Sequence, residues 1–167
     1  SGMHTWQDEV GNQWGRLQSK NPDAKSIILG SHLDSVPNAG KYDGILGVVL
    51  AITLVDILIV KNIDLPFHLD IVAFGDEEGS RFGATLMGSR AIAGTWQDNW
   101  AVLKDQEQID LAGALRAFGL DINRVKHAAR TTDSVLGFVE VHIEQGPLLQ
   151  EHELAVGLVE GIAAANR

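Results

Sequence analysis

The residues of this chain that could perform metal chemistry are histidines and carboxylates placed where apolar stretches end. His32 and Asp34 stand two positions apart in Gly30–Ser35 (GSHLDS), at the junction of an apolar stretch and a polar loop. A metal-binding imidazole needs its second nitrogen held, commonly by a carboxylate, and Asp34 could provide that support to His32. Taken alone, this His-x-Asp pair is a weak signal, and an ordinary polar loop after a strand is the better interpretation.

A second group of candidate residues consists of carboxylates. Asp43 follows His32 by eleven positions and directly precedes a long apolar run, so in isolation it is better interpreted as a helix N-cap. Asp76, Glu77 and Glu78 follow another apolar stretch, where adjacent acids usually form a solvated turn. Clustered carboxylates resist joint ionisation unless a cation offsets them, so one Glu could bind a metal ion while its neighbour acts as general base.

His142 is the remaining candidate, in Val141–Gly146 (VHIEQG). It lies on the polar face of an alternating stretch, beside acids, although a lone histidine on a strand is more often a satisfied surface group. The other histidines have no comparable setting and are interpreted as surface or structural residues: His4, His68, His127 and His152.

Three predicted strands position these residues. Ser26–Leu33 and Phe67–Phe74 are short and apolar, and Val135–Glu144 alternates strictly enough to predict a third strand. A His or a carboxylate lies at or just after the end of each stretch. Open α/β sheets place their sites at the carboxyl ends of strands, so the three ends predict one shared site.

The run Gly44–Val60 (GILGVVLAITLVDILIV) predicts a helix buried in the core of a soluble protein. A membrane-spanning helix needs about 20 apolar residues, and this shorter run contains Asp56. The sequence therefore indicates no membrane partner.

Further helices are predicted at Ala84–Ala93 and at Asp110–Phe118, the latter capped by Asp110 and closed at Gly119. Leu154–Ile162 predicts another strand. Alternation of strands and helices predicts an α/β three-layer sandwich, with a mostly parallel mixed sheet and helices on both faces.

Composition limits the function classes. The 167 residues carry a formal net charge of -9 and include no cysteine. Nucleic acid is excluded as a main partner because Lys and Arg are scattered rather than arranged in a basic stripe. The lack of cysteine excludes a Cys-based zinc site and fits a reducing, cytoplasmic compartment. Residues 1–167 are interpreted as one domain, with Ser1–Met3 as a cloning scar.

Three stretches resemble the hydantoinase/carbamoylase amidase group of the zinc aminoacylase and aminopeptidase superfamily, which includes N-carbamoyl-L-amino acid hydrolases and allantoate amidohydrolases. These stretches are GSHLDSVPNAGKYDGILGV, AFGDEEGSRFGATLMGSRAIAG and FVEVHIEQGPLLQ, in the family's order and approximate spacing. The likeness runs from about Asp8 to Gly161. It implies a zinc-peptidase-like catalytic domain that hydrolyses non-peptide C–N bonds of a small N-carbamoyl or ureido acid.

The resemblance also implies a centre of two divalent metal ions. His32, Asp43 and His142 would surround one ion, and Asp43 would bridge to a second ion that Glu78 also binds. Zinc is expected, while manganese and cobalt suit the same ligands. A cis peptide bond is expected between Asp43 and Gly44, as is typical of the family.

Further roles follow from the same resemblance. Glu77 would be the general base, Asp34 would orient His32, and Gln145 would contact substrate. The family's last metal ligand, its lid domain and most of its homodimer contact lie beyond the position matching Arg167. The resemblance therefore implies a truncated catalytic domain without a lid, with one metal site incomplete and little or no turnover.

Two alternatives remain open. An aminoacylase or dipeptidase of the same superfamily would use similar chemistry, although many such relatives have a carboxylate where His142 stands. A non-catalytic α/β binding or remnant domain predicts that His32, Asp43, Glu78 and His142 do not converge. The choice between allantoate and N-carbamoyl amino acids is also open.

Overall fold

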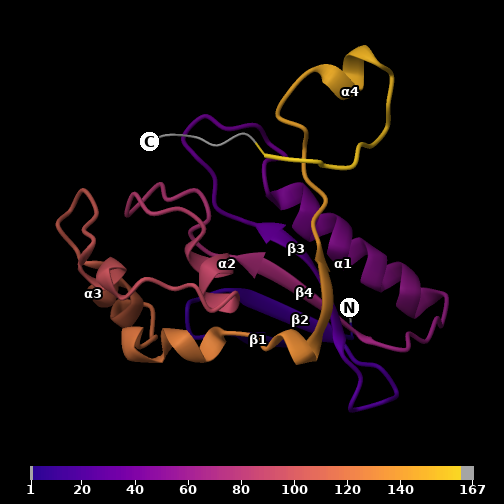
Figure 1. The fold of residues 1–167 in the computed structure, drawn as a ribbon, viewed down its shortest axis with the longest axis horizontal. Coiled ribbons are helices and arrows are strands. Elements are labelled where there is room, and N and C mark those ends of the chain that lie inside the picture. Colours follow the sequence, from indigo (N-terminus) through magenta and orange to yellow (C-terminus); the bar gives the residue numbers. More distant parts are fainter. Residues whose placement is uncertain (1, 163–167) are drawn as a thin grey trace.

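The computed structural model describes residues 2–162, which form a five-stranded mixed sheet with the order β1-β2-β4-β3-β5 (Figure 1). The strands are β1 (His4–Gln7), β2 (Gln13–Leu17), β3 (Ser26–His32), β4 (His68–Phe74) and β5 (Val135–Val139). Strands β4, β3 and β5 are parallel, whereas β2 is antiparallel to both β1 and β4. Because the three parallel strands share a direction, their carboxyl ends meet at one edge of the sheet.

Helix α1 (Ile45–Val60) covers one face of this sheet. Ala51 and Val55 of α1 pack against Leu69 and Ile71 of β4 in an apolar cluster. All of β4 is buried, as expected for a central strand that is covered on both faces.

The opposite face carries a second apolar cluster, which contains Trp14, Val72 and Phe74 and contacts Ile92 of α2 (Met87–Ile92). Beyond α2 lie η1 (Asp98–Val102), α3 (Leu111–Ala117), η2 (Ile122–Ala128) and η3 (Thr132–Ser134). This segment and α2 share a separate core, in which Met87 and Val125 are almost fully buried. The predicted α/β fold with helices on both faces is therefore confirmed.

Helix α1 is apolar on all sides, but only one face of it is buried. Gly47, Val48, Ala51 and Val55 face the sheet, while outward residues such as Val60 are exposed in the described part of the chain. The prediction of a helix buried in the core is correct for the inner face and wrong for this outer face. Within residues 2–162, no helix is both long and apolar enough to cross a membrane.

The other predicted helices are present with changed limits. The side chain of Asp110 accepts a hydrogen bond from the backbone N–H of Gly113 and caps α3, as predicted. Helix α2 begins only at Met87 because Leu86, at φ 63°, has a left-handed conformation that does not continue a helix. The loop that precedes α2 instead carries Glu77 and Glu78, two residues of the candidate site.

Two predicted strands need correction. β5 ends at Val139 rather than Glu144, because its ladder with β3 ends where Leu29 pairs with Val139. Leu154–Ile162 is exposed and contains no strand, since no neighbouring strand pairs with it among the described residues. It follows the short helix α4 (Leu148–Glu151), which projects beyond the sheet (Figure 1).

The hairpin of β1 and β2 was not predicted. Trp6 pairs with Trp14 across the two strands, and their rings stack with centroids 5.6 Å apart. The side chain of Asp8 accepts hydrogen bonds from Asn12 and from the Trp14 indole, which closes the turn between the strands. These contacts join residues that are several positions apart, and the sequence shows no alternation of apolar residues that would predict the hairpin.

Candidate metal centre

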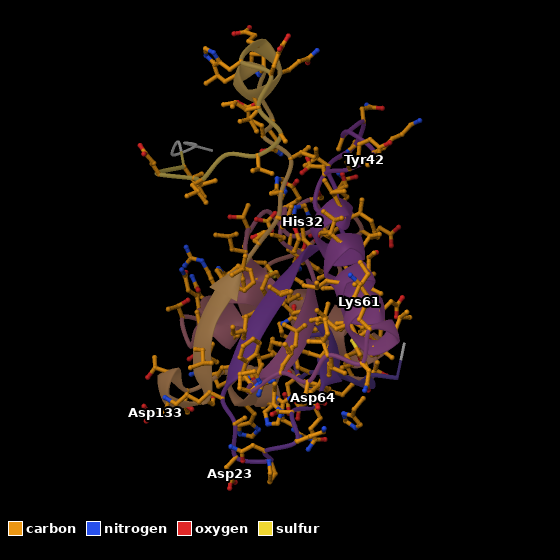
Figure 2. The ribbon with its side chains drawn as sticks, turned by 90° about the vertical axis from the view of Figure 1, so that its right-hand side faces the viewer. Asp23, His32, Tyr42, Lys61, Asp64 and Asp133 are labelled. Atoms are coloured by element: carbon orange, nitrogen blue, oxygen red, sulfur yellow. The ribbon has the colours of Figure 1, made fainter. Side chains whose placement is uncertain are left out.

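His32 is the buried centre of the candidate site, at the carboxyl end of β3. It is 4% exposed, and Figure 2 places it near one end of the sheet, with Asp23 and Asp133 near the other end. Its Nδ1 lies 2.7 Å from the backbone carbonyl oxygen of Asp34. A carbonyl oxygen can only accept, so Nδ1 donates to it, and the neutral form of the ring presents its Nε2 lone pair to the site.

His142 presents its ring in the same way. Its Nδ1 lies 2.9 Å from the carbonyl oxygen of Ile143, so Nδ1 donates to that oxygen and the neutral form of the ring has its lone pair on Nε2. The Nε2 atoms of His142 and His32 are 3.4 Å apart. Two facing lone pairs are repulsive unless a cation or proton lies between them. Two nitrogens bound to one tetrahedral zinc ion would be about 3.3 Å apart, so this arrangement suits a shared metal ion.

Asp43 completes the first group of possible ligands. Its Oδ1 lies 3.3 Å from Nε2 of His142 and 4.0 Å from Nε2 of His32, and the side chain is 10% exposed. Asp43 does not cap α1, because the N-cap residue is Gly44 and no side chain makes the capping hydrogen bond. The carboxylate faces the histidines instead.

Glu77 and Glu78 form the second group of possible ligands with His32. Ligand atoms of these three residues all lie within 4.8 Å of one another. Oε2 of Glu77 is 3.9 Å from Nε2 of His32. Asp43 belongs to the first group and Glu78 to the second, and His32 is common to both.

Asp34 supports both groups, but in a way that the sequence did not indicate. Its carboxylate accepts hydrogen bonds from the backbone N–H groups of Glu77, at 3.1 Å, and Glu78, at 3.0 Å. The nearest distance from this carboxylate to Nδ1 of His32 is 4.0 Å, so the Asp34 backbone carbonyl is what holds the imidazole. Asp34 thereby fixes the acidic loop relative to the histidine.

Two glycines allow the close approach of these segments. A Cβ on Gly44 would lie 2.4 Å from the ring of His32, and one on Gly47 would lie 2.4 Å from the carbonyl oxygen of Val141. Gly44 also has φ 74°, a conformation that suits glycine. The cis bond expected between Asp43 and Gly44 is absent: no peptide bond in the described chain is cis, and the chain turns through the Gly44 dihedral angles.

The acids of this edge are difficult to ionise together. Burial raises the pKa of Glu77, and the carboxylates of Glu78, Asp34 and Glu140 raise it further, whereas His32 would lower it when its ring is protonated. Burial likewise raises the pKa of Asp76 to about 6, with a contribution from Asp34 and an opposing one from Arg81. A divalent cation would make these acids easier to ionise, because its positive charge offsets the clustered negative charge.

Two residues that the sequence did not single out connect the strands beneath the site. The hydroxyl of Ser31, which is fully buried, donates a hydrogen bond of 2.6 Å to Oε1 of Glu140. This contact ties the segment after β5 to β3, where the backbone ladder has already ended, and so helps place His142. The position of Glu140 on the same predicted strand face as His142 was the available signal.

Gln145 also reaches the site. Its Nε2 donates hydrogen bonds of 3.1 Å to both carboxylate oxygens of Asp43. Residues predicted from four distant parts of the chain are thus adjacent, which contradicts the alternative of a non-converging remnant domain.

Fold and site together define a class: an α/β domain with a histidine–carboxylate cluster, able to hold metal, at the carboxyl edge of its parallel strands. The chain belongs to peptidase family M20/M25/M40, a metal-dependent family whose model matches residues 28–163. The resemblance inferred from the three motifs is therefore confirmed.

Sequence relatives carry the names that the resemblance implies. The chain is 44% identical over 163 residues to an N-carbamoyl-L-amino acid amidohydrolase of Geobacillus stearothermophilus, covering 98% of this chain and 40% of the relative. It is 39% identical over 171 residues to allantoate deiminase 1 of Glycine max, covering 100% of this chain and 35% of that protein. The chain thus spans well under half the length of these relatives.

Solved structures with similar folds support the same family assignment. A hydantoinase/carbamoylase family amidase from Burkholderia ambifaria matches with a TM-score of 0.81 and 33% identity, over 91% of this chain and 36% of that one. A structure of AtUAH in complex with (S)-hydroxyglycine matches with a TM-score of 0.82 and 30% identity, over 91% and 37% of the two chains.

Proposed function

We propose that this chain provides most of the metal centre of an amidohydrolase that cleaves the C–N bond of N-carbamoyl-L-amino acids or allantoate. The observation that carries the proposal is the pair of Nε2 atoms of His32 and His142, 3.4 Å apart beside the carboxylate of Asp43. The names of the relatives support the substrate class. The proposal includes zinc as the metal, a cytoplasmic location and a homodimer of the whole protein.

The donor atoms suit divalent metal ions of the zinc type. His32, Asp43 and His142 would hold one ion, and Glu78 would take part in holding a second. Neutral imidazole and carboxylate are ligands that zinc, manganese and cobalt share. When bound, such ions lower the pKa of coordinated water toward about 7 and polarise a carbonyl group.

Residues of this chain would then transfer protons and hold the reacting groups in position. Glu77 would take a proton from water and later deliver it to the leaving nitrogen, a contribution of about 10²–10⁴ in rate. Asp34 holds the Glu77 and Glu78 amides and, through its carbonyl, keeps the Nε2 lone pair of His32 available. Gln145 would contact the substrate.

Isothermal titration with zinc tests the ligand assignment. His142→Ala and Asp43→Ala each remove one member of the first ligand group, so we expect zinc affinity to fall by at least about tenfold, as for loss of a direct ligand. Glu77→Gln should bind zinc nearly as well as the unchanged chain. His127→Ala, an exposed histidine outside the site, is the matched control. Loss of binding in Glu77→Gln would overturn the division between base and ligand.

Ammonia release tests the substrate class. Hydrolysis of an N-carbamoyl amino acid or of allantoate frees ammonia, whereas hydrolysis of an acylated amino acid or a dipeptide does not. For the 167-residue chain we expect little or no turnover, and for the whole protein we expect ammonia. Hydrolysis of acyl or peptide substrates without ammonia would favour the aminoacylase alternative.

A further inference from the structure

We infer that Asn12 is a positioning residue of the metal centre: its buried side-chain amide joins the two ends of the acidic loop (residues 75–86) and so holds Glu77 and Glu78 beside His32. The inference rests on the metal centre proposed above and adds to it a residue from the turn between β1 and β2, outside both ligand groups. It follows from the backbone hydrogen bonds of the loop and from the contacts of the Asn12 amide.

The two ends of the acidic loop lie side by side. The loop begins after β4 and leads into α2, and it contains no helix or strand of its own. Backbone amides at its α2 end donate to carbonyl oxygens at its β4 end, in three successive pairs: Gly88 to Gly75 at 3.1 Å, Met87 to Asp76 at 3.3 Å, and Leu86 to Glu77 at 2.7 Å. The placement of Glu77 and Glu78 therefore depends on how these two ends are held.

Asn12 adds a further connection between the same two ends. Its Oδ1 accepts a hydrogen bond of 2.9 Å from the backbone amide of Gly75, and its Nδ2 donates one of 3.2 Å to the carbonyl oxygen of Gly88. Nδ2 also donates to the carboxylate of Asp8 at 2.8 Å. The side chain thus bridges Gly75 and Gly88 as a backbone peptide group would, and Asn12 is 0% exposed.

The surroundings of Asn12 suit a carboxamide, which has one acceptor oxygen and two donor hydrogens. An aspartate at this position would bring a second carboxylate against Asp8. A leucine would leave the Gly75 amide and the Gly88 carbonyl without these partners, which is costly in a buried place. Gly88 also has no room for a side chain, since a Cβ there would lie 2.2 Å from Oδ1 of Asn12.

Asn12 and Asp34 hold the acidic loop at different points. Asn12 binds the amide of Gly75, and Asp34 accepts from the amides of Glu77 and Glu78. Opening of the loop at Gly75 would free the backbone just before the two glutamates, and a metal ion would then have to order it. Residues that hold a ligand from outside commonly change metal affinity 10–100-fold.

Zinc titration of the two ligand groups, one at a time, tests the inference. Two single variants separate the groups: His142→Ala keeps His32, Glu77 and Glu78 together, and Glu78→Ala keeps His32, Asp43 and His142 together. Adding Asn12→Ala should weaken zinc binding at least about tenfold in the His142→Ala chain. In the Glu78→Ala chain it should change zinc binding by less than about threefold, because Asp43 and His142 lie on other segments.

Gln13→Ala is the matched control. It removes the neighbouring carboxamide, whose Nε2 donates to the carbonyl oxygen of Trp6 within the hairpin, and it should change zinc binding in neither chain. Equal weakening of both chains by Asn12→Ala would show a general structural effect and overturn the inference. Zinc that binds the Glu78→Ala chain but not the His142→Ala chain would overturn it too, while leaving the first ligand group intact.

Hydrogen exchange of the unchanged chain gives a second measurement that does not require Asn12→Ala to fold. Coupling between two sites is reciprocal, so zinc bound by Glu77 and Glu78 should stabilise the contact with Asn12 and slow exchange of the Gly75 amide about tenfold. In the Glu78→Ala chain, zinc should leave this exchange unchanged. Gly75 exchange that zinc does not slow in the unchanged chain overturns the inference. Failure of the metal centre itself would look different, because the unchanged chain would bind no zinc.

Discussion

At the scale of single residues, the site depends on two glycines, which have no side chain, as much as on the residues that could bind metal. His32 lies against the Cα of Gly44, and the segment that carries His142 lies against Gly47. Any larger residue at either position would push one imidazole away from the other. The short distance between the Nε2 atoms is therefore set by two glycines that carry no chemistry of their own.

Gly44→Ala should damage both stability and metal binding. Its Cβ would lie 2.4 Å from the His32 ring, and the backbone φ of 74° is unfavourable for alanine. We expect a loss of about 1–3 kcal/mol in the free energy of unfolding, as for overpacking in a core. Urea unfolding and zinc titration measure the two effects. Gly40→Ala is the matched control, because a Cβ there meets no atom within 4 Å; equal effects of both changes would refute this account.

At the scale of elements, buried charge joins the hairpin to the parallel strands. The guanidinium of Arg16 on β2 donates hydrogen bonds of 2.6 Å and 2.7 Å to the two carboxylate oxygens of Asp70 on β4. The Asp70 side chain is 1% exposed, and Arg130 approaches it at 3.7 Å. The pair fixes the antiparallel edge of the sheet relative to the strands that carry the site.

Arg16→Ala should lower the free energy of unfolding by about 3 kcal/mol, because it leaves a buried carboxylate with only Arg130 nearby. Lys20→Ala breaks an ion pair with Asp64 in which both side chains are largely exposed, and such pairs contribute little. Urea unfolding of both variants gives the comparison. Equal destabilisation by the two changes would show that burial of Asp70 is not the cause.

The carboxylate of Asp105, in the loop before α3, makes the stability of the fold depend on pH. Burial raises the pKa of Asp105, but hydrogen bonds from the Ile109 amide, Arg81 and the Glu107 amide outweigh it, so the pKa lies below its ordinary value. A lowered folded-state pKa stabilises the fold above the unfolded-state pKa of about 3.9, and this contribution is lost as pH falls through the lowered value.

Asp105→Asn should therefore unfold more easily than the unchanged chain at pH 7 and at pH 5, with a difference that shrinks below about pH 4. Urea unfolding across this range measures it. Asp98→Asn, at an exposed pair with Lys126, is the control and should show little difference at any pH. A difference that grows as the solution becomes more acidic would contradict the lowered pKa.

At the scale of the whole molecule, the charge balance favours metal binding. The chain has a formal net charge of -9, and several of its acids gather at one edge of the sheet. A ligand that binds only the folded state stabilises it in proportion to the logarithm of its concentration. A cation at this edge would join the ends of β3, β4 and β5.

Zinc at about 100 times its dissociation constant should raise the free energy of unfolding by about 2.7 kcal/mol, and a chelator should reverse the effect. Thermal unfolding with and without zinc measures this change. His142→Ala should lose most of the stabilisation. If zinc stabilised that variant as strongly as the unchanged chain, the ion would be binding elsewhere.

The sequence by itself determined the types of elements and of ligands. Periodicity and turn residues are local, so β3, β4, α1 and α3 were predicted close to their observed limits, and the parallel strand ends indicated the right edge. Tertiary structure alone decided which atoms meet. His32 and His142 are 110 residues apart, and only the pairing of β3 with β5 and the Ser31–Glu140 contact brings their rings together. Asp43 faces the histidines instead of capping α1 because the chain turns at Gly44, and strand limits such as Val139 depend on a neighbour that no local pattern encodes.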